Sequence, residues 1–543
     1  MSHRRPLSQF LRLTVALLAL AAATAAATSI EVRAEDARPK ARPPDAEQRQ
    51  PADSASRRLP TDSVTRHRIE LPGRSLSFTA TAGSIPLANP QGRVIAEIAY
   101  IAYALDGTEP RQRPVTFAFN GGPGSASSWL HVGNFGPWRL QIDEGSISPS
   151  APVVLEPNGE TWLDFTDLVF IDPVGTGYSH IVADSREGGE DGNRRGSGST
   201  EDSSRRHFWS VDGDVESISE FMQKWLEKSG RLTSPKMLVG ESYGGFRGPK
   251  IARKLQEKYG VGLNALVLIS PVLDFAGRRN GPMPFVSVLP SLAAASFERR
   301  GEAVSRERLK SIEEYARTDY MNDLMRGPRD AAAVDRTVAK VAEIAGLPED
   351  TVRRYGARIS GSTYNREVNR PEGKTASLYD ASIKGLSENP TSSNPRDNDP
   401  LTAALNAPLT TAMLDLYNTR LGWRVDQRYI NTNGDANRAW NWGNSTSSPE
   451  SLGDMREALA LDPHLRVIVA HGFTDLVTPY FGSALVLDQL PAHGDVQRVK
   501  AVVYPGGHMF YTRDASRKAF REDALHLMER IIIEANNTQK SGQ

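Results

Sequence analysis

The sequence of 543 residues contains no cysteine. This absence excludes disulfide bonds, metal sites built from thiolates and cysteine nucleophiles, and it also excludes a lipid anchor attached to an N-terminal cysteine. It does not identify the cellular compartment, because an exported protein can fold without disulfide bonds.

An excess of charge of one sign is also missing. The chain carries 65 Lys and Arg residues against 65 Asp and Glu residues, which gives a formal net charge of zero. No basic stripe suggests a nucleic-acid partner, and no acidic tail suggests a cationic partner. Beyond the N-terminus no run of about 18 apolar residues appears, so we expect no membrane association once the N-terminal segment is removed.

The N-terminus itself has the pattern of a secretory signal peptide. Arg4, Arg5 and Arg12 precede an Ala- and Leu-rich run at 13–27. An uncleaved membrane anchor is the alternative, but the run is short and rich in alanine for a membrane span. We therefore predict a signal peptide at 1–34 and an exported protein, either periplasmic or secreted.

The composition and the hydrophobic pattern of the rest of the chain change several times. Residues 35–65 are rich in Pro, Arg, Asp and Gln, which predicts a flexible linker. Short strand-like runs follow, and then apolar runs alternate with helical patterns, which predicts an α/β fold with a mainly parallel central sheet covered on both faces. The alternation stops after Leu273 and resumes at Leu465, so we expect an inserted, mostly helical domain.

The predicted organisation is a first core part at 66–273 with a surface loop at 184–206, an inserted helical cap domain at 274–449, a second core part at 450–536 and a polar tail at 537–543.

One stretch, Gly-Glu-Ser-Tyr-Gly at 240–244, has the pattern of a nucleophile elbow. It lies between an apolar run at 237–239 and a helical pattern at 251–259, and a strand, a sharp turn and a helix are the context that such an elbow requires. The glycines matter because the serine occupies a strained turn in which neighbouring side chains would clash. The pattern alone also fits a loop serine in a glycine-rich turn.

An attacking serine needs a base, an acid that orients the base, and donors for the oxyanion. His508 follows the last apolar strand in a loop with two glycines, and Asp475 follows the strand that ends at Ala470. His471 is the main competitor for the role of base. The order Ser242, Asp475, His508 is the order of the α/β-hydrolase triad.

A second glycine-rich element, Asn-Gly-Gly-Pro-Gly-Ser at 120–125, follows a strand-like run that ends at Phe119. An α/β-hydrolase places its second oxyanion donor at this point. A nucleotide-binding loop is the rival interpretation. It fails because no Gly-Lys-Ser/Thr follows and because Pro123 removes a backbone donor.

Taken together, these elements resemble the serine carboxypeptidases. The resemblance rests on 120–125, on Asp-Pro-Val-Gly-Thr-Gly-Tyr-Ser at 172–179, on 240–245, on the Asp475 loop and on Gly507-His508, which occur in the family's order. It implies an α/β-hydrolase fold in a bacterial-type member without cysteines. It also implies hydrolysis of the C-terminal bond of a peptide substrate with a free C-terminus, through an acyl-enzyme, with no cofactor and no metal.

The resemblance implies a role for each residue of the site. The catalytic residues would be Ser242 as nucleophile, His508 as base and Asp475 as its orienting acid; the oxyanion hole would be the backbone amides of Gly122 and Tyr243; and the substrate carboxylate would be bound by Asn120, Gly121 and Glu241.

Glu241 has a consequence for the pH dependence. A glutamate beside a bound carboxylate must share a proton with it, because two like charges at that distance cannot both ionise. We therefore expect tight substrate binding at acidic pH. The competing interpretation is that Glu241 is a buried acid that only braces the elbow.

Two positions depart from the family's usual pattern. Ser125 stands where the family commonly has a disulfide-bonded cysteine, so we expect the insert to be held by packing alone. Arg247 stands where an aromatic residue is usual, and it either alters the pocket for the leaving residue or points to solvent. Two rival functions fit the same scaffold: an esterase or acyltransferase, and a non-catalytic binding protein with a vestigial site.

Overall fold

The computed structural model of the protein describes residues 58–142, 148–182, 200–279, 281–392, 397–443, 447–492 and 496–541. The predicted signal peptide and residues 35–57 of the predicted linker lie outside the described residues, as does most of the predicted loop at 184–206.

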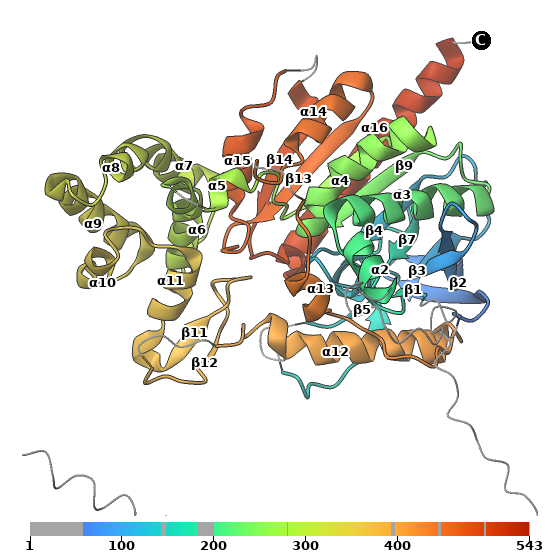
Figure 1. Cartoon of the computed structure of the whole chain (residues 1–543), viewed down its shortest axis with the longest axis horizontal. Helices are drawn as coiled ribbons and strands as arrows, with labels where there is room; N and C mark the ends of the chain where they lie inside the picture. Colours follow the sequence, from blue (N-terminus) through green and yellow to red (C-terminus); the bar gives the residue numbers. More distant parts are fainter. Residues whose placement is uncertain are drawn as a thin grey trace, which may run out of the picture. The chain divides into compact units, whose positions relative to one another are not determined.

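A ten-stranded sheet forms the centre of the described part of the chain (Figure 1). Its strands, in spatial order, are β1 (Ser63–Leu71), β2 (Arg74–Ala88), β3 (Val94–Leu105), β7 (Asp167–Ile171), β4 (Val115–Phe119), β9 (Lys236–Glu241), β10 (Ala265–Ile269), β13 (Arg466–Gly472) and β14 (Val499–Tyr504), and β8 (His180–Ile181) pairs with β3. Strands β1, β2, β3 and β7 pair in antiparallel fashion, and all pairs from β7 to β14 are parallel. The predicted α/β fold with a mainly parallel sheet is confirmed.

The burial of the strands explains why the sequence forms this sheet. The parallel strands β4, β7, β9 and β10 are buried at every position, as expected for strands that helices cover on both faces. Strand β2 instead alternates between buried and exposed positions over its first half, because one of its faces meets water. Strand β1 begins at Ser63, inside the range that we expected to be a linker, and the buried Leu59 just before it donates its amide to Glu97.

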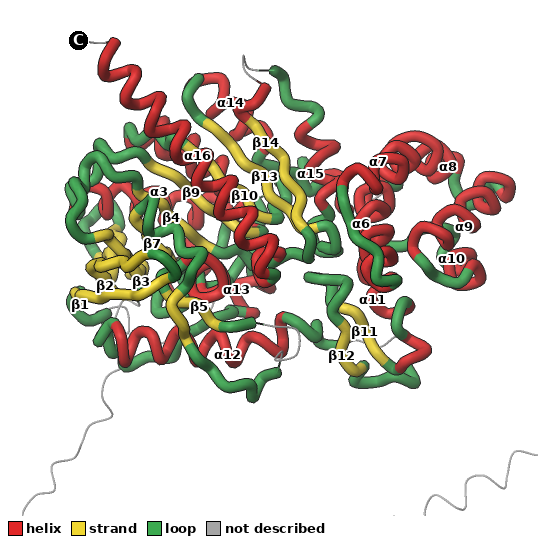
Figure 2. The backbone as a smooth tube through the Cα atoms, turned by 180° about the vertical axis from the view of Figure 1, so that it is seen from behind, coloured by secondary structure: helices red, strands yellow, loops and turns green. Residues whose placement is uncertain are grey.

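Helices cover the two faces of the sheet (Figures 1 and 2). One face packs against α3 (Val211–Lys228), α4 (Tyr243–Lys254) and α14 (Leu452–Leu461), and the other packs against α16 (Asp514–Ser541) and α12 (Thr402–Asp415). Helix α16 reaches Ser541, so most of the predicted polar tail is helical. The shorter elements of the core are α1 (Ser128–Leu130), β5 (Trp138–Leu140), β6 (Leu155–Pro157), α2 (Thr200–Phe208) and α15 (Tyr480–Leu487).

The stretch between β10 and α14 is mostly helical. Its elements are α5 (Ala276–Arg279), α6 (Met283–Arg299), α7 (Arg306–Tyr315), α8 (Met321–Arg326), α9 (Ala331–Ala345), α10 (Glu349–Arg354), α11 (Gly361–Glu367), β11 (Lys374–Ala376), β12 (Lys384–Leu386), α12 and α13 (Gly434–Arg438). Helices α6 to α11 share a hydrophobic cluster of their own, which also takes in Phe473 and Leu476. Residues between Leu401 and Tyr429, by contrast, pack into the cluster on the sheet. The stretch therefore contains a helical lobe and a separate segment that wraps the core.

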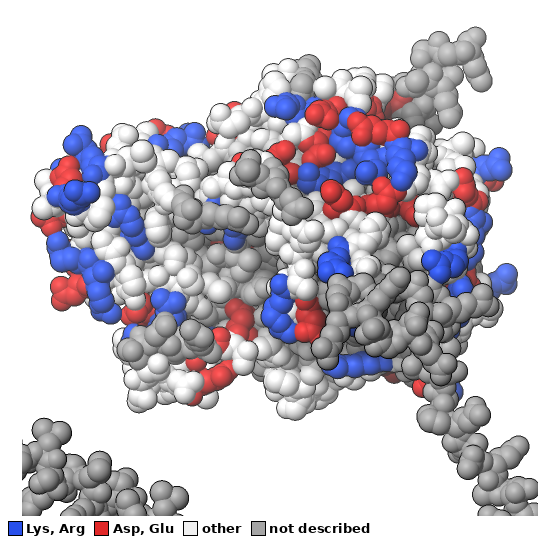
Figure 3. All heavy atoms as spheres, viewed as in Figure 1, with Lys and Arg blue, Asp and Glu red and all other residues white. Residues whose placement is uncertain are grey.

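Charged side chains of both signs are interspersed on the face shown in Figure 3. Lysines and arginines on α4 pair with glutamates and aspartates on α3 and α14, as in the contacts of Lys254 with Glu216 and of Lys250 with Asp454. Among the described helices, none is both long enough and apolar enough to cross a membrane.

Candidate active site

The predicted site residues lie at or just after the carboxyl ends of parallel strands. Asn120 follows β4, Ser242 follows β9, Asp475 follows β13 and His508 follows β14. Because β4, β9, β10, β13 and β14 are parallel neighbours, these four loops meet at one edge of the sheet.

Ser242 occupies the strained turn that the sequence predicts. Its backbone has φ 60° and ψ −120°, a conformation that L-residues rarely adopt. The flanking glycines are required by space: a Cβ at Gly240 would lie 2.2 Å from the carbonyl oxygen of Gly244. The turn is anchored by a 2.8 Å hydrogen bond from the Ser242 amide to the carbonyl of Ile269. The Ser242 side chain is thus presented at the sheet edge by a rigid elbow.

His508 and Asp475 form a buried pair. His508 Nδ1 lies 2.8 Å from Asp475 Oδ2, and both side chains are almost fully buried. Burial alone would lower the pKa of His508, but the charge of Asp475 and the hydrogen bond to it outweigh burial and raise that pKa. Burial would raise the pKa of Asp475, and the positive charge of His508 reverses this and lowers it. The pair therefore orients the imidazole, and Nε2 is the nitrogen left to accept a proton.

Thr478 and its backbone hold Asp475 in place. The Thr478 hydroxyl donates to Asp475 Oδ2 at 2.5 Å and lies 3.0 Å from His508 Nδ1. The amides of Val477 and Thr478 donate to Asp475 Oδ1, each at 2.8 Å. Four donors, including the imidazole, thus satisfy this buried carboxylate, which keeps it ionised.

The loops that carry Ser242 and His508 meet across the end of β10. Ile269, the last residue of that strand, accepts the Ser242 amide, and the hydroxyl of the next residue, Ser270, donates to the carbonyl of His508 at 2.8 Å. The rival base, His471, is buried and hydrogen-bonds to Ser483 Oγ through Nε2 at 2.9 Å. Burial lowers the pKa of His471 to about 4, and Asp475 is paired with His508 instead.

The glycine-rich loop after β4 lies directly against the elbow. A Cβ at Gly121 would lie 2.5 Å from the amide nitrogen of Tyr243 and 2.6 Å from the carbonyl oxygen of Glu241, so only glycine fits. Gly122 has φ 106°, which again favours glycine. Among the hydrogen bonds found within the described residues, none uses the amide of Gly122 or of Tyr243. Both predicted oxyanion donors are therefore available to a ligand.

Glu241 lies buried between two donors. Asn120 Nδ2 donates to Glu241 Oε1 at 2.8 Å, and the hydroxyl of Tyr511 donates to Oε2. The amide of Leu130 donates to Asn120 Oδ1, which fixes the orientation of the Asn120 side chain. Burial raises the pKa of Glu241 to about 7, although the charge of His508 and the two hydrogen bonds oppose the rise. The site thus holds a carboxyl group that exchanges its proton near neutral pH.

Arg247 points inward and not to solvent, so one of the two expectations for it is wrong. Its side chain is buried and pairs with Asp214 at 2.7 Å and 2.9 Å. It also donates to the carbonyl of Asn120, and its guanidinium lies over the ring of Tyr243 at 5.1 Å. Burial raises the pKa of Asp214 despite this partner. Arg247 therefore braces both the loop after β4 and the elbow from behind.

Hydrogen bonds tie the insert to the loop after β4, so the expectation that packing alone holds the insert is wrong. Ser125, which stands where the family commonly has a cysteine, forms a β-bridge with Thr432. Asn433 donates its amide to the carbonyl of Gly124, and its side chain donates to the carbonyl of Gly175 at 2.8 Å.

Three features of the site carry no signal in the sequence. Thr478 and Tyr511 are neighbours of predicted residues, but nothing in their spacing marks them. The third is an insert segment at 378–381. Tyr379 accepts the amide of His508 and its ring lies edge-on to the imidazole at 5.3 Å, and Asp380 accepts the hydroxyl of Thr474 at 2.7 Å. The insert thus supports both catalytic loops.

A cavity of about 780 Å³ lies between the Asp475 loop and the helical lobe. Its lining is largely apolar and includes Leu273, Val288, Leu378, Leu476 and Val486, and Thr478 also borders it. Within the described ranges, no group of three or more histidine, aspartate and glutamate side chains could hold a metal ion.

Comparisons with known proteins agree with this arrangement. A family model described as serine carboxypeptidase matches residues 98–515. Serine carboxypeptidase-like 5 of Arabidopsis thaliana is 25% identical over 268 residues, which is 46% of this chain and 54% of the relative. The pheromone-processing carboxypeptidase kex1 of Neosartorya fischeri is 29% identical over 150 residues, which is 27% of this chain and 19% of the relative.

The chain thus spans about half the length of the first of these relatives and less of the second. A similar fold is found in the crystal structure of Kex1(delta)p, a prohormone-processing carboxypeptidase from Saccharomyces cerevisiae. That structure has a TM-score of 0.50 and 17% identity, and the match covers 85% of this chain and 92% of the yeast chain.

Proposed function

Because the chain belongs to the serine carboxypeptidase family, we propose that it hydrolyses the last peptide bond of peptides that carry a free C-terminal carboxylate. The observation that carries this proposal is the Glu241 carboxyl. It is buried beside the elbow, bonded by Asn120 and Tyr511, and has a pKa of about 7. A carboxyl that holds a proton at this place can share it with a substrate carboxylate, which supports an exopeptidase over a general hydrolase.

In the proposed reaction, Ser242 Oγ attacks the carbonyl carbon of the last peptide bond while His508 Nε2 takes the hydroxyl proton. The C–N bond then breaks, the imidazolium gives this proton to the departing amine, and one amino acid leaves. Water activated by His508 hydrolyses the acyl group from Ser242. Asp475 stabilises the imidazolium throughout, which is consistent with the raised pKa of His508.

We assign stabilisation of the negative charge that develops on the carbonyl oxygen to the amides of Gly122 and Tyr243. Both amides lack a protein acceptor among the described residues, and both belong to segments held rigid from behind by Arg247. A preformed pair of donors needs no reorganisation at the moment of attack, which supports this assignment.

We assign binding of the substrate carboxylate to Asn120, Gly121 and Glu241. Within the described residues, no arginine or lysine forms an ion pair or hydrogen bond with Glu241, so one proton shared between Glu241 and the substrate replaces a cation. We therefore expect kcat/KM to be bell-shaped in pH. It falls on the acid side as His508 becomes protonated and on the alkaline side as Glu241 loses its proton, and the apparent pKa values belong to the interacting pair.

We assign the apolar cavity beside Thr478 to a substrate side chain next to the cleaved bond. Its size and its largely apolar lining support peptides with a large apolar residue at that position. A panel of peptides that differ only there tests this: the apolar members should have the lowest KM, and a preference for charged members would contradict it.

The decisive test compares two peptides of one sequence, one with a free C-terminus and one amidated. The free peptide should be cleaved and the amidated one should be a poor substrate, most clearly below the pH at which Glu241 loses its proton. Equal cleavage of both, or activity only on esters, would support the esterase or acyltransferase instead. Failure of a serine-reactive phosphonate to label Ser242 would support a binding protein with a vestigial site.

The place of action is also part of the proposal. The N-terminal pattern at 1–34 supports export from the cytoplasm, to the periplasm or out of the cell, in a bacterial-type member of the family, followed by removal of this segment. N-terminal sequencing of the protein recovered outside the cytoplasm tests it, since a chain that still begins at Met1 would contradict removal.

A further inference from the structure

Tyr511 is a residue to which the reaction above assigns no role. It lies three residues after His508, at the start of the segment that leads into α16, and its side chain is fully buried. Its hydroxyl donates to Glu241 Oε2, the oxygen that Asn120 does not contact. Both oxygens of the Glu241 carboxyl therefore have a donor of their own in the protein.

The chemistry of this contact has a definite direction. Burial, followed by the charge of Glu241, raises the pKa of Tyr511 well above its usual value, so the phenol stays protonated and remains a donor. A donor that faces a carboxyl favours the ionised form, because a carboxylate accepts more strongly than a carboxylic acid. Tyr511 thus opposes the effect of burial, which favours the protonated form of Glu241.

The other groups around Glu241 come from separate elements. Asn120, on the loop after β4, donates a hydrogen bond and favours the ionised form. The positive charge of His508 acts in the same direction, and the negative charge of Asp475 acts against it. The phenol of Tyr379, from the insert, is held protonated chiefly by burial. Of the two groups that donate to Glu241, Tyr511 can lose its donor with the smaller change of shape, because phenylalanine differs from tyrosine by one oxygen.

We propose that Tyr511 is a positioning residue of the carboxylate site: its hydroxyl fixes the Glu241 carboxyl and stabilises its ionised form, and so sets the pH above which the site releases a carboxylate. The second half of this proposal rests on the proposed function. The first half concerns the protein alone. Without the hydroxyl, Glu241 would keep its proton to higher pH, and carboxylate binding would persist further into the alkaline range.

The primary experiment is the pH profile of kcat/KM for the wild type and for Tyr511→Phe with the free-C-terminus peptide. The alkaline limb should move up by about one pH unit, because a hydrogen bond to a charged group is worth roughly one to two pH units. The shift should appear in KM, while kcat at the optimum changes by less than about tenfold. An alkaline limb that stays in place, or moves down, overturns the proposal.

Tyr480→Phe provides a matched control. Tyr480 is also buried and its hydroxyl also donates to a buried glutamate, Glu313, at 2.9 Å, but this pair joins α15 to α7 of the helical lobe. Loss of the Tyr480 hydroxyl should lower the melting temperature about as much as Tyr511→Phe does, and it should leave the pH profile of kcat/KM unchanged. If both variants move the alkaline limb equally, the effect is a general consequence of destabilisation and the proposal fails.

A double variant tests whether Tyr511 acts through Glu241. Glu241→Gln removes the titrating group, so the alkaline limb should disappear, and adding Tyr511→Phe to Glu241→Gln should then move nothing further along the pH axis. A second shift in the double variant would show that Tyr511 acts on another group.

A measurement without substrate separates this proposal from the proposed function. The protonated carboxyl of Glu241 can be followed against pH by infrared difference spectroscopy, with the band assigned by its loss in Glu241→Gln. Its midpoint should lie higher in Tyr511→Phe than in the wild type, and an equal or lower midpoint overturns the proposal. If free and amidated peptides prove equally good substrates, the proposed function fails, and the infrared midpoint still decides the role of Tyr511.

Discussion

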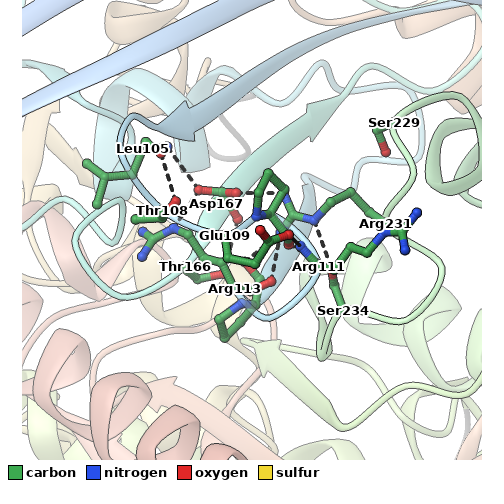
Figure 4. Close-up of polar contacts among 12 residues, drawn as sticks. Leu105, Thr108, Glu109, Arg111, Arg113, Thr166, Asp167, Ser229, Arg231 and Ser234 are labelled. Atoms are coloured by element: carbon green, nitrogen blue, oxygen red, sulfur yellow. Dashed lines mark hydrogen bonds and ion pairs between the residues drawn. The ribbon is translucent and has the colours of Figure 1, made fainter.

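Strand β7 begins with one buried aspartate, Asp167, and is followed directly by another, Asp172. The two aspartates have different surroundings. Asp167, at the amino end, pairs with Arg231 at 2.6 Å and with Arg113 at 2.7 Å and accepts the amide of Leu105 (Figure 4). Asp172, just past the carboxyl end, accepts the amide of Ser127, and no cation pairs with it in the described part of the chain.

The same difference separates the two ends of the parallel strands, which we call the amino edge and the carboxyl edge of the sheet. At the amino edge, Arg231 and Ser234 complete a network in which every buried side-chain polar atom has a partner. At the carboxyl edge, a serine sits in a strained turn, and two amides lack an acceptor among the residues that the structure describes. Burial there raises the pKa of both Glu241 and Asp172 to about 7. Polar groups are buried at both edges, so it is their partners that separate a stabilising network from a reactive site.

The largest expected effect comes from matched serine substitutions. Ser242→Ala should lower kcat by about 10³-fold or more, because it removes the nucleophile, and should change the melting temperature little. Ser234→Ala removes a hydroxyl that binds Arg231 Nε at 2.7 Å and should lower the melting temperature without changing kcat. Steady-state kinetics and thermal unfolding check both, and an active Ser242→Ala enzyme would end the proposed mechanism.

The second comparison uses two buried arginines, each paired with an aspartate. Arg247→Met should lower the free energy of unfolding by about 3–5 kcal/mol, because it leaves the buried Asp214 carboxylate without its cation. Arg231→Met should lower it by less, because Arg113 still pairs with Asp167. Only Arg247→Met should also lower kcat/KM, by roughly tenfold or more, since Arg247 supports Asn120 and Tyr243. Denaturant unfolding and kinetics at a temperature where both variants are folded distinguish them. Equal kcat/KM in the two would mean that Arg247 is structural only.

The aspartates at the ends of β7 should differ in the pH dependence of stability. The pKa of Asp172 rises by burial from 3.8 to about 7 in the folded protein. As pH increases from about 4 to about 7, the unfolded chain ionises this group before the folded protein does. The contribution of Asp172 to the free energy of unfolding therefore falls by about 1.4 kcal/mol for each pH unit over this range, and it is constant above pH 7.

Asp172→Asn removes that loss, so the variant should gain stability relative to the wild type as pH rises from 4 to 8. Asp167→Asn should instead weaken the pairing with Arg113 and Arg231 and be less stable than the wild type at neutral pH. Unfolding free energies measured across this range check the two signs. A parallel pH dependence in Asp172→Asn and the wild type would contradict the neutral state of Asp172.

The smallest expected effect concerns two threonine hydroxyls. Thr478→Val removes one donor to Asp475 and should lower kcat by about tenfold, which corresponds to one hydrogen bond of about 1.4 kcal/mol. Thr116→Val removes a buried hydroxyl that bonds to Thr166 at 2.8 Å, away from the triad. It should cost a similar amount of stability and leave kcat unchanged. A loss of kcat in both would show that the effect is not specific to the Asp475 loop.

The two edges of the sheet also differ in how far the sequence predicts them. The elbow and the loop after β4 could be predicted because glycine is the residue that fits at Gly240 and Gly121, and such steric demands leave a fixed local pattern. The alternation of apolar runs with helical patterns predicted the parallel sheet. The choice of His508 over His471 rested on the order of the motifs, and the pairing of His508 with Asp475 agrees with it.

By itself, then, the sequence determined the fold class, through the alternation of patterns along the chain. It also predicted the candidate triad and the loop that faces it, through short local patterns and their order. Only the tertiary structure decided which buried polar groups became partners: Tyr511 with Glu241, Arg247 with Asp214, and Tyr379 with His508. It also decided that residues between Leu401 and Tyr429 pack on the sheet and not with the helical lobe. Such partners are set by which distant loops the chain brings together, and a buried polar group leaves no mark of its partner in the residues next to it.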